Sequence, residues 1–288
     1  MFRNARLHLF LTAGALIATI ACSGAVPTAP SSVSAPADGG GAASTAQGGT
    51  QATAEDGVSS PQGLTPGVVA GAVGATRYLA FGDSITRGVL SSFDGVFLFD
   101  AGPAVSYPYQ LQSSLGLGHP SQSFTVENQG VPGETAATGS QRLQSVLEVQ
   151  RPQVLLLLEG INDLNGGQSV SATIGRLQTM VDIARLYNVT VLIANMFQTY
   201  VTEDPYDGHI RNNAAELIPS FNAGISQIAQ GQQNVFVVDL YHAFSTAPNP
   251  RSLVGGDGLH PTEQGYARIA SWFRAAIEQT FAVRGAFQ

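Results

Sequence analysis

The sequence lacks lysine altogether and has one cysteine in 288 residues. Without lysine, the chain cannot form a Schiff base with a carbonyl substrate or with pyridoxal phosphate, and it has no phosphate-binding lysine of the Walker type. The single cysteine, Cys22, excludes an intramolecular disulfide and a CxxC site for zinc or redox chemistry. The fold must therefore be stabilised by an ordinary hydrophobic core.

Patterns for binding metal and nucleic acid are also missing. The five histidines include no HExxH pair or similar ligand spacing, so we expect no metal site. The 20 acidic residues exceed the 13 arginines and give a net charge of −7. Because no basic cluster interrupts this excess, we expect no nucleic-acid partner.

The N-terminus has the features of an export signal. Arg3 and Arg6 precede an apolar run at residues 9–20, which is shorter than the roughly 20 residues of a membrane-spanning helix. The run leads into Ala21 and Cys22, and residues 19–22 resemble a bacterial lipobox, whose cysteine is lipid-modified and becomes the mature N-terminus. The alternative is a conventionally cleaved secretory signal. Both interpretations predict removal of residues 1–21 and export of the protein.

Residues 22–75 have the composition of a flexible tether. After Cys22 the segment is rich in Ala, Gly, Ser, Thr and Pro, has no aromatic residue, and has Leu64 as its only leucine. Such a segment cannot bury enough apolar surface to offset the entropy of ordering. The remaining residues, 76–288, are enough for one domain with a sizeable core.

Within residues 76–288, short apolar runs alternate with segments whose apolar residues recur about every 3.6 positions. The apolar runs are predicted to be strands buried on both faces, at residues 78–81, 124–127, 154–158, 189–194 and 235–238. The periodic segments are predicted to be helices, at residues 109–117, 141–149, 170–187, 217–229 and 262–281. This alternation predicts a three-layer α/β/α sandwich with a five-stranded parallel sheet. In such folds, ligands bind beyond the carboxyl ends of the strands.

The first three predicted strands end in residues that can take part in catalysis. The first strand is followed by Gly-Asp-Ser, which places the Ser84 hydroxyl at a turn on the ligand-binding edge. The second ends near Gly130, where the absence of a Cβ would let a backbone N–H approach a ligand. The third ends near Asn162, whose side-chain amide can donate to an oxyanion. Taken alone, each residue is also compatible with a helix cap or a turn.

A glycine-rich loop at residues 255–261 carries Asp257 and His260 after the fifth predicted strand. At this spacing the carboxylate can accept the Nδ1 proton of the imidazole, which leaves Nε2 to act as a base. A neutral histidine near a serine hydroxyl can take its proton and so activate it as a nucleophile. Taken alone, this pair is also compatible with a surface turn.

The segments that carry Ser84, Gly130 and Asn162, followed by the loop with Asp257 and His260, form four sequence blocks. In their residues and their order along the chain, these blocks resemble those of the SGNH (GDSL-type) hydrolases, and the resemblance extends over residues 78–281. The resemblance implies a flavodoxin-like sheet and a hydrolase that needs no cofactor. It implies that Ser84 is the nucleophile, His260 the general base and Asp257 the residue that orients the histidine. It also implies an oxyanion hole made by the Ser84 N–H, the Gly130 N–H and the Asn162 side chain.

Two predicted connections, residues 88–106 and 195–213, are longer than connections usually are. Both follow strands, so we expect both to overhang the catalytic edge and to form pocket walls. The aromatic candidates for these walls are Phe93, Phe97, Phe99, Tyr200 and Tyr206, which can bury an acyl chain or stack on sugar rings. The alternative is that they only cover the core.

These features predict an exported serine esterase that hydrolyses carboxylic esters through an acyl-enzyme. Lysophospholipid, lipid or short acyl esters form the first substrate group, and acetylated polysaccharide is the alternative within the same reaction class. An alternative of another class is a surface carbohydrate-binding or adhesion module that has kept the fold. The expected partners are a small-molecule or polysaccharide ester and, through a lipid anchor at Cys22, a membrane.

Overall fold

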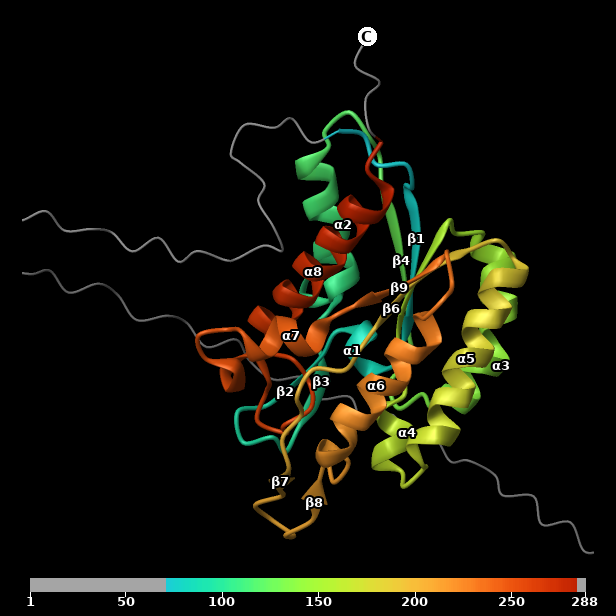
Figure 1. The fold of residues 1–288 in the computed structure, drawn as a ribbon. Coiled ribbons are helices and arrows are strands. Elements are labelled where there is room, and N and C mark those ends of the chain that lie inside the picture. The colour runs from blue at the N-terminus through green and yellow to red at the C-terminus, as the bar shows by residue number, and fades with distance from the viewer. Residues whose placement is uncertain (1–70, 284–288) are drawn as a thin grey trace, which may run out of the picture. The chain divides into compact units, whose positions relative to one another are not determined.

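The computed structural model describes residues 71–283 (Figure 1). The predicted signal peptide, Cys22 and most of the predicted tether lie outside these residues. The domain begins earlier than the expected boundary at residue 76, because Val73 pairs with Ala282 in an antiparallel bridge and both Val73 and Ala75 are buried. The Val73 N–H also donates to the Gln122 side chain at 2.8 Å. Residues at the end of the tether-like segment thus join the core, so the expected boundary is wrong by a few residues.

A parallel five-stranded sheet forms the centre of the domain, as predicted. Its strands are β1 (Arg77–Gly82), β4 (Thr125–Gly130), β5 (Val154–Leu158), β6 (Thr190–Ala194) and β9 (Val235–Val238). They are arranged in the order β4-β1-β5-β6-β9, and every neighbouring pair is parallel. This is the flavodoxin-like order, in which the chain moves to one side of β1 and then to the other. The switch point, where such sheets bind ligands, lies between β1 and β5.

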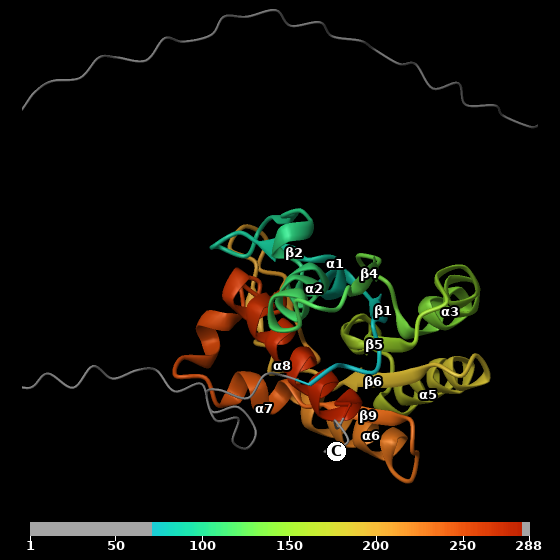
Figure 2. The ribbon, with the colours of Figure 1, turned by 90° about the horizontal axis from the view of Figure 1, so that it is seen from above.

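Helices cover both faces of the sheet (Figures 1 and 2). One face is covered by α2 (Tyr107–Gly118), α7 (Leu240–Ser245) and α8 (Glu263–Phe281), and the other by α3 (Ala136–Gln150), α5 (Val170–Leu186) and α6 (Ile218–Ala229). Because both faces are covered, β5 is buried along its whole length and reads Val-Leu-Leu-Leu-Leu. Within residues 71–283, no helix is both long enough and apolar enough to cross a membrane.

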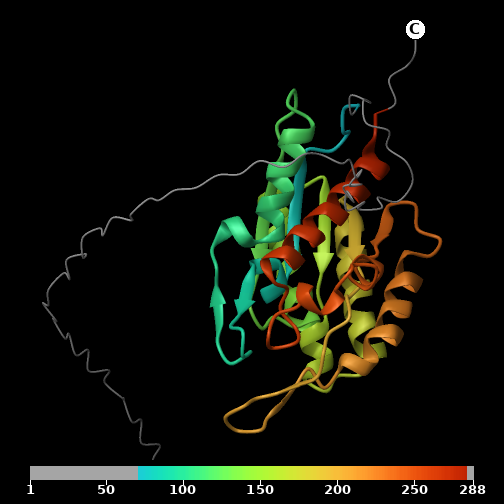
Figure 3. The ribbon, with the colours of Figure 1, turned by 90° about the vertical axis from the view of Figure 1, so that its left-hand side faces the viewer.

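Several short elements were not apparent from the sequence. They are the helices α1 (Ser84–Arg87) and α4 (Ile161–Asn165) and the 3-10 turns at Pro103–Val105, Ala215–Leu217 and Pro250–Leu253. The two long connections also contain hairpins: β2 (Val89–Ser91) pairs with β3 (Leu98–Asp100), and β7 (Thr202–Glu203) pairs with β8 (Ile210–Arg211). Both hairpins project beyond the same end of the central sheet (Figure 3).

Candidate active site

Ser84 is the first residue of α1, directly after β1. Gly82 permits this turn, because a Cβ at that position would lie 1.9 Å from the carbonyl oxygen of Leu158 in the neighbouring strand β5. Asp83 caps the short helix by accepting the Ile85 N–H at 2.8 Å. The close packing and the cap hold the Ser84 hydroxyl at the carboxyl end of the sheet, beside the switch point.

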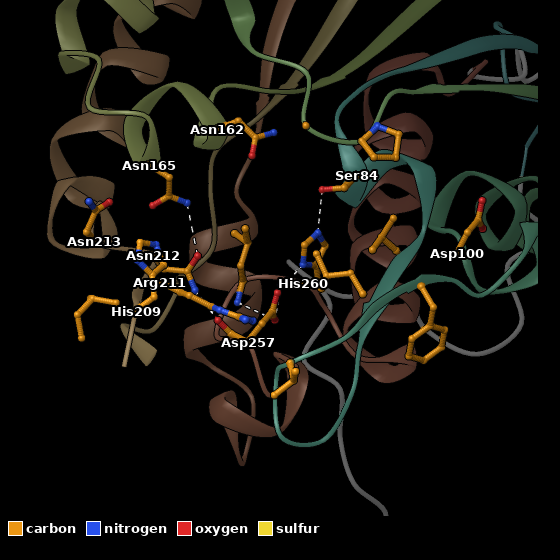
Figure 4. Close-up of a pocket in the computed structure, with 18 residues that line it drawn as sticks. Ser84, Asp100, Asn162, Asn165, His209, Arg211, Asn212, Asn213, Asp257 and His260 are labelled. Carbon is orange, nitrogen blue, oxygen red and sulfur yellow. Dashed lines mark hydrogen bonds and ion pairs between the residues drawn. The ribbon is translucent and has the colours of Figure 1, made fainter. Parts of the chain in front are cut away.

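His260 lies against the Ser84 hydroxyl and links it to Asp257 (Figure 4). The distance from His260 Nε2 to Ser84 Oγ is 2.8 Å, and the distance from His260 Nδ1 to Asp257 Oδ2 is 2.5 Å. The three side chains are buried. A carboxylate at Nδ1 fixes the tautomer in which Nε2 of the neutral imidazole faces the serine as an acceptor. The arrangement can therefore remove the Ser84 proton.

Asp257 is held as a carboxylate by its own loop. Its Oδ1 accepts the N–H groups of Leu259 at 3.2 Å and of His260 at 3.1 Å. Burial alone would raise the pKa of Asp257, but the hydrogen bonds from His260 and from the backbone outweigh that effect and hold the pKa below its usual range. Asp257 is therefore ionised at neutral pH and can orient the imidazole.

The second hairpin fixes the backbone of the same loop. The Thr202 hydroxyl donates to the Asp257 carbonyl oxygen at 2.9 Å, and Asn212 Nδ2 donates to it at 2.5 Å. These residues are 55 and 45 positions from Asp257 in the chain, so no local pattern could reveal them. Both are positioning residues that the sequence analysis missed.

Asn162 lies in α4, directly after β5, and borders the same pocket as Ser84 and His260 (Figure 4). Its Nδ2 donates to the Glu134 carbonyl oxygen at 2.8 Å and to Asp83 Oδ2 at 3.2 Å. The longer of these hydrogen bonds is the easier one for an oxyanion to replace. Asn162 is thus held beside the nucleophile with one N–H that can turn to a ligand.

Gly130 does not occupy the position expected for an oxyanion donor. Its N–H donates to Asn128 Oδ1 at 2.9 Å, and a Cβ at Gly130 would lie 2.2 Å from the Arg87 backbone nitrogen. Gly130 therefore packs against α1, and its N–H is already bonded within the protein. The prediction that this N–H faces a ligand is wrong.

Gly133, three positions after Gly130, has the backbone N–H beside the pocket that was expected at Gly130. It borders the pocket together with Ser84 and Asn162, and its N–H makes no hydrogen bond to any residue within 71–283. Its φ of +77° also explains why glycine is needed there. The block contains both glycines, and the spacing alone did not distinguish them.

The pocket around these residues has a volume of about 720 Å³. The first hairpin contributes an apolar wall that includes Val89, Val96, Leu98 and Phe99. The facing wall, from α4 and the segment around β8, is polar and carries Asn165, His209, Arg211, Asn212 and Asn213 (Figure 4). The site is therefore amphipathic, with Ser84 between an apolar and a polar wall.

Comparison with known proteins identifies the family of the chain. A sequence model of the GDSL-like Lipase/Acylhydrolase family matches residues 80–268. The chain belongs to this family. Membership carries ester hydrolase activity of the GDSL type with it. No curated protein matches the chain.

Solved structures share the fold of this GDSL-like hydrolase. It is similar to the aryl esterase from M. smegmatis, at 20% identity and a TM-score of 0.59, over 72% of this chain and 100% of that one. A lipase/acylhydrolase from Enterococcus faecalis matches at 20% identity and a TM-score of 0.56, over 73% of this chain and 100% of that one. A family 3 carbohydrate esterase from Clostridium thermocellum matches at 22% identity and a TM-score of 0.53, over 72% of this chain and 100% of that one.

Of the aromatic residues predicted for the pocket walls, Phe99 lines the pocket. Phe93 and Phe97 lie on the same hairpin but outside the pocket, and both are exposed. Tyr206 is exposed on the second hairpin, and the half-buried ring of Tyr200 packs under the Arg251 guanidinium. Contrary to the prediction, these four residues do not line the pocket.

Glu159, at the end of β5, is a second buried carboxyl group near the nucleophile turn. Its Oε1 accepts the Gly160 N–H at 3.1 Å, whereas its buried Oε2 has no hydrogen-bond partner within residues 71–283. Burial, aided by the charge of Asp83, raises the pKa of Glu159 well above its usual range. Burial likewise raises the pKa of Asp83 to about 6. Burial therefore favours the neutral, protonated form of Glu159 over its carboxylate.

Two features outside the Ser84 site concern His242 and the arrangement of side chains that could bind a metal ion. His242 is exposed on α7 and lies edge-on to Trp272, outside the pocket. Within the described part of the chain, no group of three or more His, Cys, Asp or Glu side chains is arranged to hold a metal ion.

Proposed function

We propose that this GDSL-like hydrolase is an exported serine esterase that hydrolyses carboxylic esters through an acyl-enzyme at Ser84. The contact of 2.8 Å between Ser84 Oγ and His260 Nε2 carries the proposal. A hydroxyl that already donates to a histidine, which is itself oriented by a carboxylate, needs no rearrangement before it reacts. A binding module that had only kept the fold would have no need of this arrangement.

The acylation step uses the proton path from Ser84 to His260. His260 Nε2 takes the hydroxyl proton while Ser84 Oγ attacks the carbonyl carbon of the ester, and Asp257 stabilises the resulting imidazolium. The carbonyl oxygen then carries the negative charge of the tetrahedral intermediate. Collapse of the intermediate expels the alcohol, which takes its proton from His260.

The oxyanion is stabilised by donors that surround its expected position. These donors are the Ser84 N–H, the Gly133 N–H and Asn162 Nδ2. The Gly133 N–H is bound to no other described residue, and Asn162 can exchange its longer hydrogen bond to Asp83 for one to the oxyanion. In deacylation, His260 removes a proton from water, which attacks the acyl carbon. As this second tetrahedral intermediate collapses, His260 returns the proton to Ser84 Oγ, and the acid is released.

The pocket walls favour an apolar acyl chain over a polysaccharide. Val89, Val96 and Phe99 on the first hairpin offer apolar surface next to the nucleophile. On the polar wall, Asn165 and Asn212 bond to each other at 3.4 Å, and Asn212 also binds the Asp257 carbonyl oxygen. Because these amide groups are used within the protein, fewer of them are free for sugar hydroxyls.

A panel of substrates tests this proposal. We expect hydrolysis of p-nitrophenyl acetate, and a kcat/KM that rises with acyl length until the apolar wall is covered, because each buried CH₂ contributes about 0.8 kcal/mol. Acetylated xylan and a lysophospholipid complete the panel. Deacetylation of xylan without any dependence on acyl length would favour the polysaccharide alternative. Folded protein that turns over none of these esters would favour the binding module.

Export of the protein is a separate part of the proposal and is supported by residues 1–22. Lipid modification at Cys22 would place the wild-type protein in the membrane fraction of the producing bacterium. A Cys22→Ser variant is then expected to be soluble or unprocessed. A wild-type protein that is soluble after export and has an unmodified N-terminus would contradict the lipid anchor and favour a conventional secretory signal.

A further inference from the structure

Large apolar side chains are exposed around the mouth of the pocket. Phe93, Phe97, Leu98 and Phe99 on the first hairpin have exposed fractions of 102, 66, 53 and 48%, and Ile210 on the second hairpin has 48%. We call these five residues the apolar rim. A two-stranded hairpin is marginally stable in water, and β3 is exposed at each of its residues. Apolar residues gathered on such a hairpin indicate that something covers them during function.

The apolar rim is continuous with the pocket. Leu98, Phe99 and Ile210 belong to the rim and also line the pocket. The two hairpins are joined where the Arg211 guanidinium donates to the Gly95 carbonyl oxygen. Both project at the same end of the sheet (Figure 3). A surface that covers the rim would therefore lie over the entrance to the nucleophile.

Three carboxyl groups next to the rim make hydrogen bonds or ion pairs within the protein. Asp94 accepts hydrogen bonds from its own turn, Asp100 is paired with Arg87 at 2.8 Å, and Asp204 is paired with Arg211. Hydrogen bonds hold the pKa of each of these three carboxyl groups below its usual range, so they are ionised at neutral pH. With both arginines paired and the carboxylates charged, the rim would not attract an anionic surface.

From these observations, we infer that the apolar rim docks onto an uncharged or zwitterionic lipid surface, from which the ester substrate passes into the pocket. This inference rests on the proposed esterase function, because it assigns a source of substrate to the same site. A sugar-binding surface would set free donors and acceptors beside its aromatic rings. Here Asp94 Oδ1 and both carboxylate oxygens of Asp204 accept hydrogen bonds within the hairpins, and the aromatic side chains are left as an apolar surface.

A tryptophan at the rim would report docking without depending on catalysis. The full chain would carry Ser84→Ala and Trp272→Phe, with either Phe93→Trp on the rim or Leu186→Trp as a matched control. Leu186 is 81% exposed at the end of α5, next to the start of β6 and so at the opposite edge of the sheet. Because both reporters keep the same N-terminal segment, a lipid anchor would affect them equally.

Vesicles of brominated phosphatidylcholine are the probe, because bromine quenches only a tryptophan that enters the bilayer. We expect strong quenching and a blue shift at position 93, with little change at position 186. Equal quenching at the two positions would overturn the docking proposal. Loss of binding to acetylated xylan in Phe93→Ser, with vesicle binding unchanged, would overturn it as well and assign the rim to polysaccharide.

Kinetics on the active enzyme separate docking from catalysis. Phe93 and Phe97 lie outside the pocket, so we expect Phe93→Ser and Phe97→Ser to leave kcat/KM for p-nitrophenyl acetate unchanged. Each variant should raise the KM for a micellar zwitterionic ester on the order of tenfold. Leu186→Ser is the control and should change neither value. An unchanged KM for the micellar ester in both rim variants would contradict docking. Absence of turnover by the wild type would instead contradict the proposed esterase.

Discussion

Ser84 and His260 are 176 positions apart in the chain, and their side chains meet at 2.8 Å between Oγ and Nε2. The turn after β1 supplies the serine, and the loop that leads into α8 supplies the histidine. The parallel sheet brings them together, because the carboxyl ends of its strands lie at one edge. The hydrogen bond depends on Asp257, which holds the imidazole from its other nitrogen at 2.5 Å.

Asp257→Asn is expected to fold normally and to lose activity. An amide at this position can donate to Nδ1 and so stabilise the tautomer in which Nε2 carries the proton and cannot accept one from Ser84. We expect kcat to fall by about 10⁴, as such a tautomer change does in a serine protease triad. Circular dichroism would verify the fold. A variant with kcat within a few-fold of wild type would show that Asp257 does not orient the base.

Asn162→Ala removes one donor to the oxyanion and should act on the transition state. We expect kcat to fall by roughly 10² to 10³ with little change in KM. Asn165→Ala, in the same pocket wall, serves as a control for general disturbance and should affect kcat much less. If Asn162→Ala changed KM alone, Asn162 would be a residue that binds the substrate in its ground state.

Gly133→Ala tests the revised oxyanion donor. At a φ of +77°, an alanine is strained by about 1–2 kcal/mol, and relief of that strain would move the N–H away from the oxyanion. Gly231→Ala is a matched control, because Gly231 has a φ of +75° and, like Gly133, open space at its Cβ position. We expect both variants to lower Tm by similar amounts and only Gly133→Ala to lower kcat. Equal kcat values in Gly133→Ala and Gly231→Ala would show that the Gly133 N–H does not stabilise the oxyanion.

Glu159→Gln is expected to change how stability depends on pH. An acid with a raised pKa binds more protons in the folded state than in the unfolded state, so the free energy of unfolding falls as pH rises above the ordinary value of about 4.3. Glutamine cannot ionise, so the variant should lose less stability between pH 5 and pH 8 than the wild type does.

Tm measured at pH 5 and pH 8 checks this expectation, with Glu216→Gln at an exposed position as the control. The Tm difference between Glu159→Gln and wild type should move in favour of the variant as pH rises. A constant difference at the two pH values would contradict a raised pKa of Glu159.

The central sheet could be predicted from the sequence because burial on both faces leaves a simple pattern. A strand such as β5 is a continuous apolar run, and a long helix such as α8 repeats its apolar residues with the helical period. The two hairpins leave no such pattern. The strands β7 and β8 have two residues each, and contacts far apart in the chain, such as that of Arg211 with Gly95, help to hold them.

The residues of the candidate site could be predicted from the sequence where they lie close to the carboxyl ends of predicted strands. Ser84 and Asn162 lie within a few residues of the carboxyl ends of β1 and β5, and Asp257 lies three positions from His260. The choice between Gly130 and Gly133 depended on where each N–H points, which is set by the turn after β4 and not by composition. Thr202 and Asn212 act through the Asp257 backbone, a contact that carries no local signal in the sequence.

Covalent labelling with a fluorophosphonate tests the central claim most directly, because the reagent bonds only to an activated nucleophile. We predict one label per chain, located at Ser84 by peptide mass spectrometry, with loss of ester turnover in proportion to labelling. Ser84→Ala should take up no label and should lose turnover by about 10⁴ to 10⁶. A label on any other serine, or a Ser84→Ala variant that keeps wild-type turnover, would contradict the assignment of Ser84 as the nucleophile.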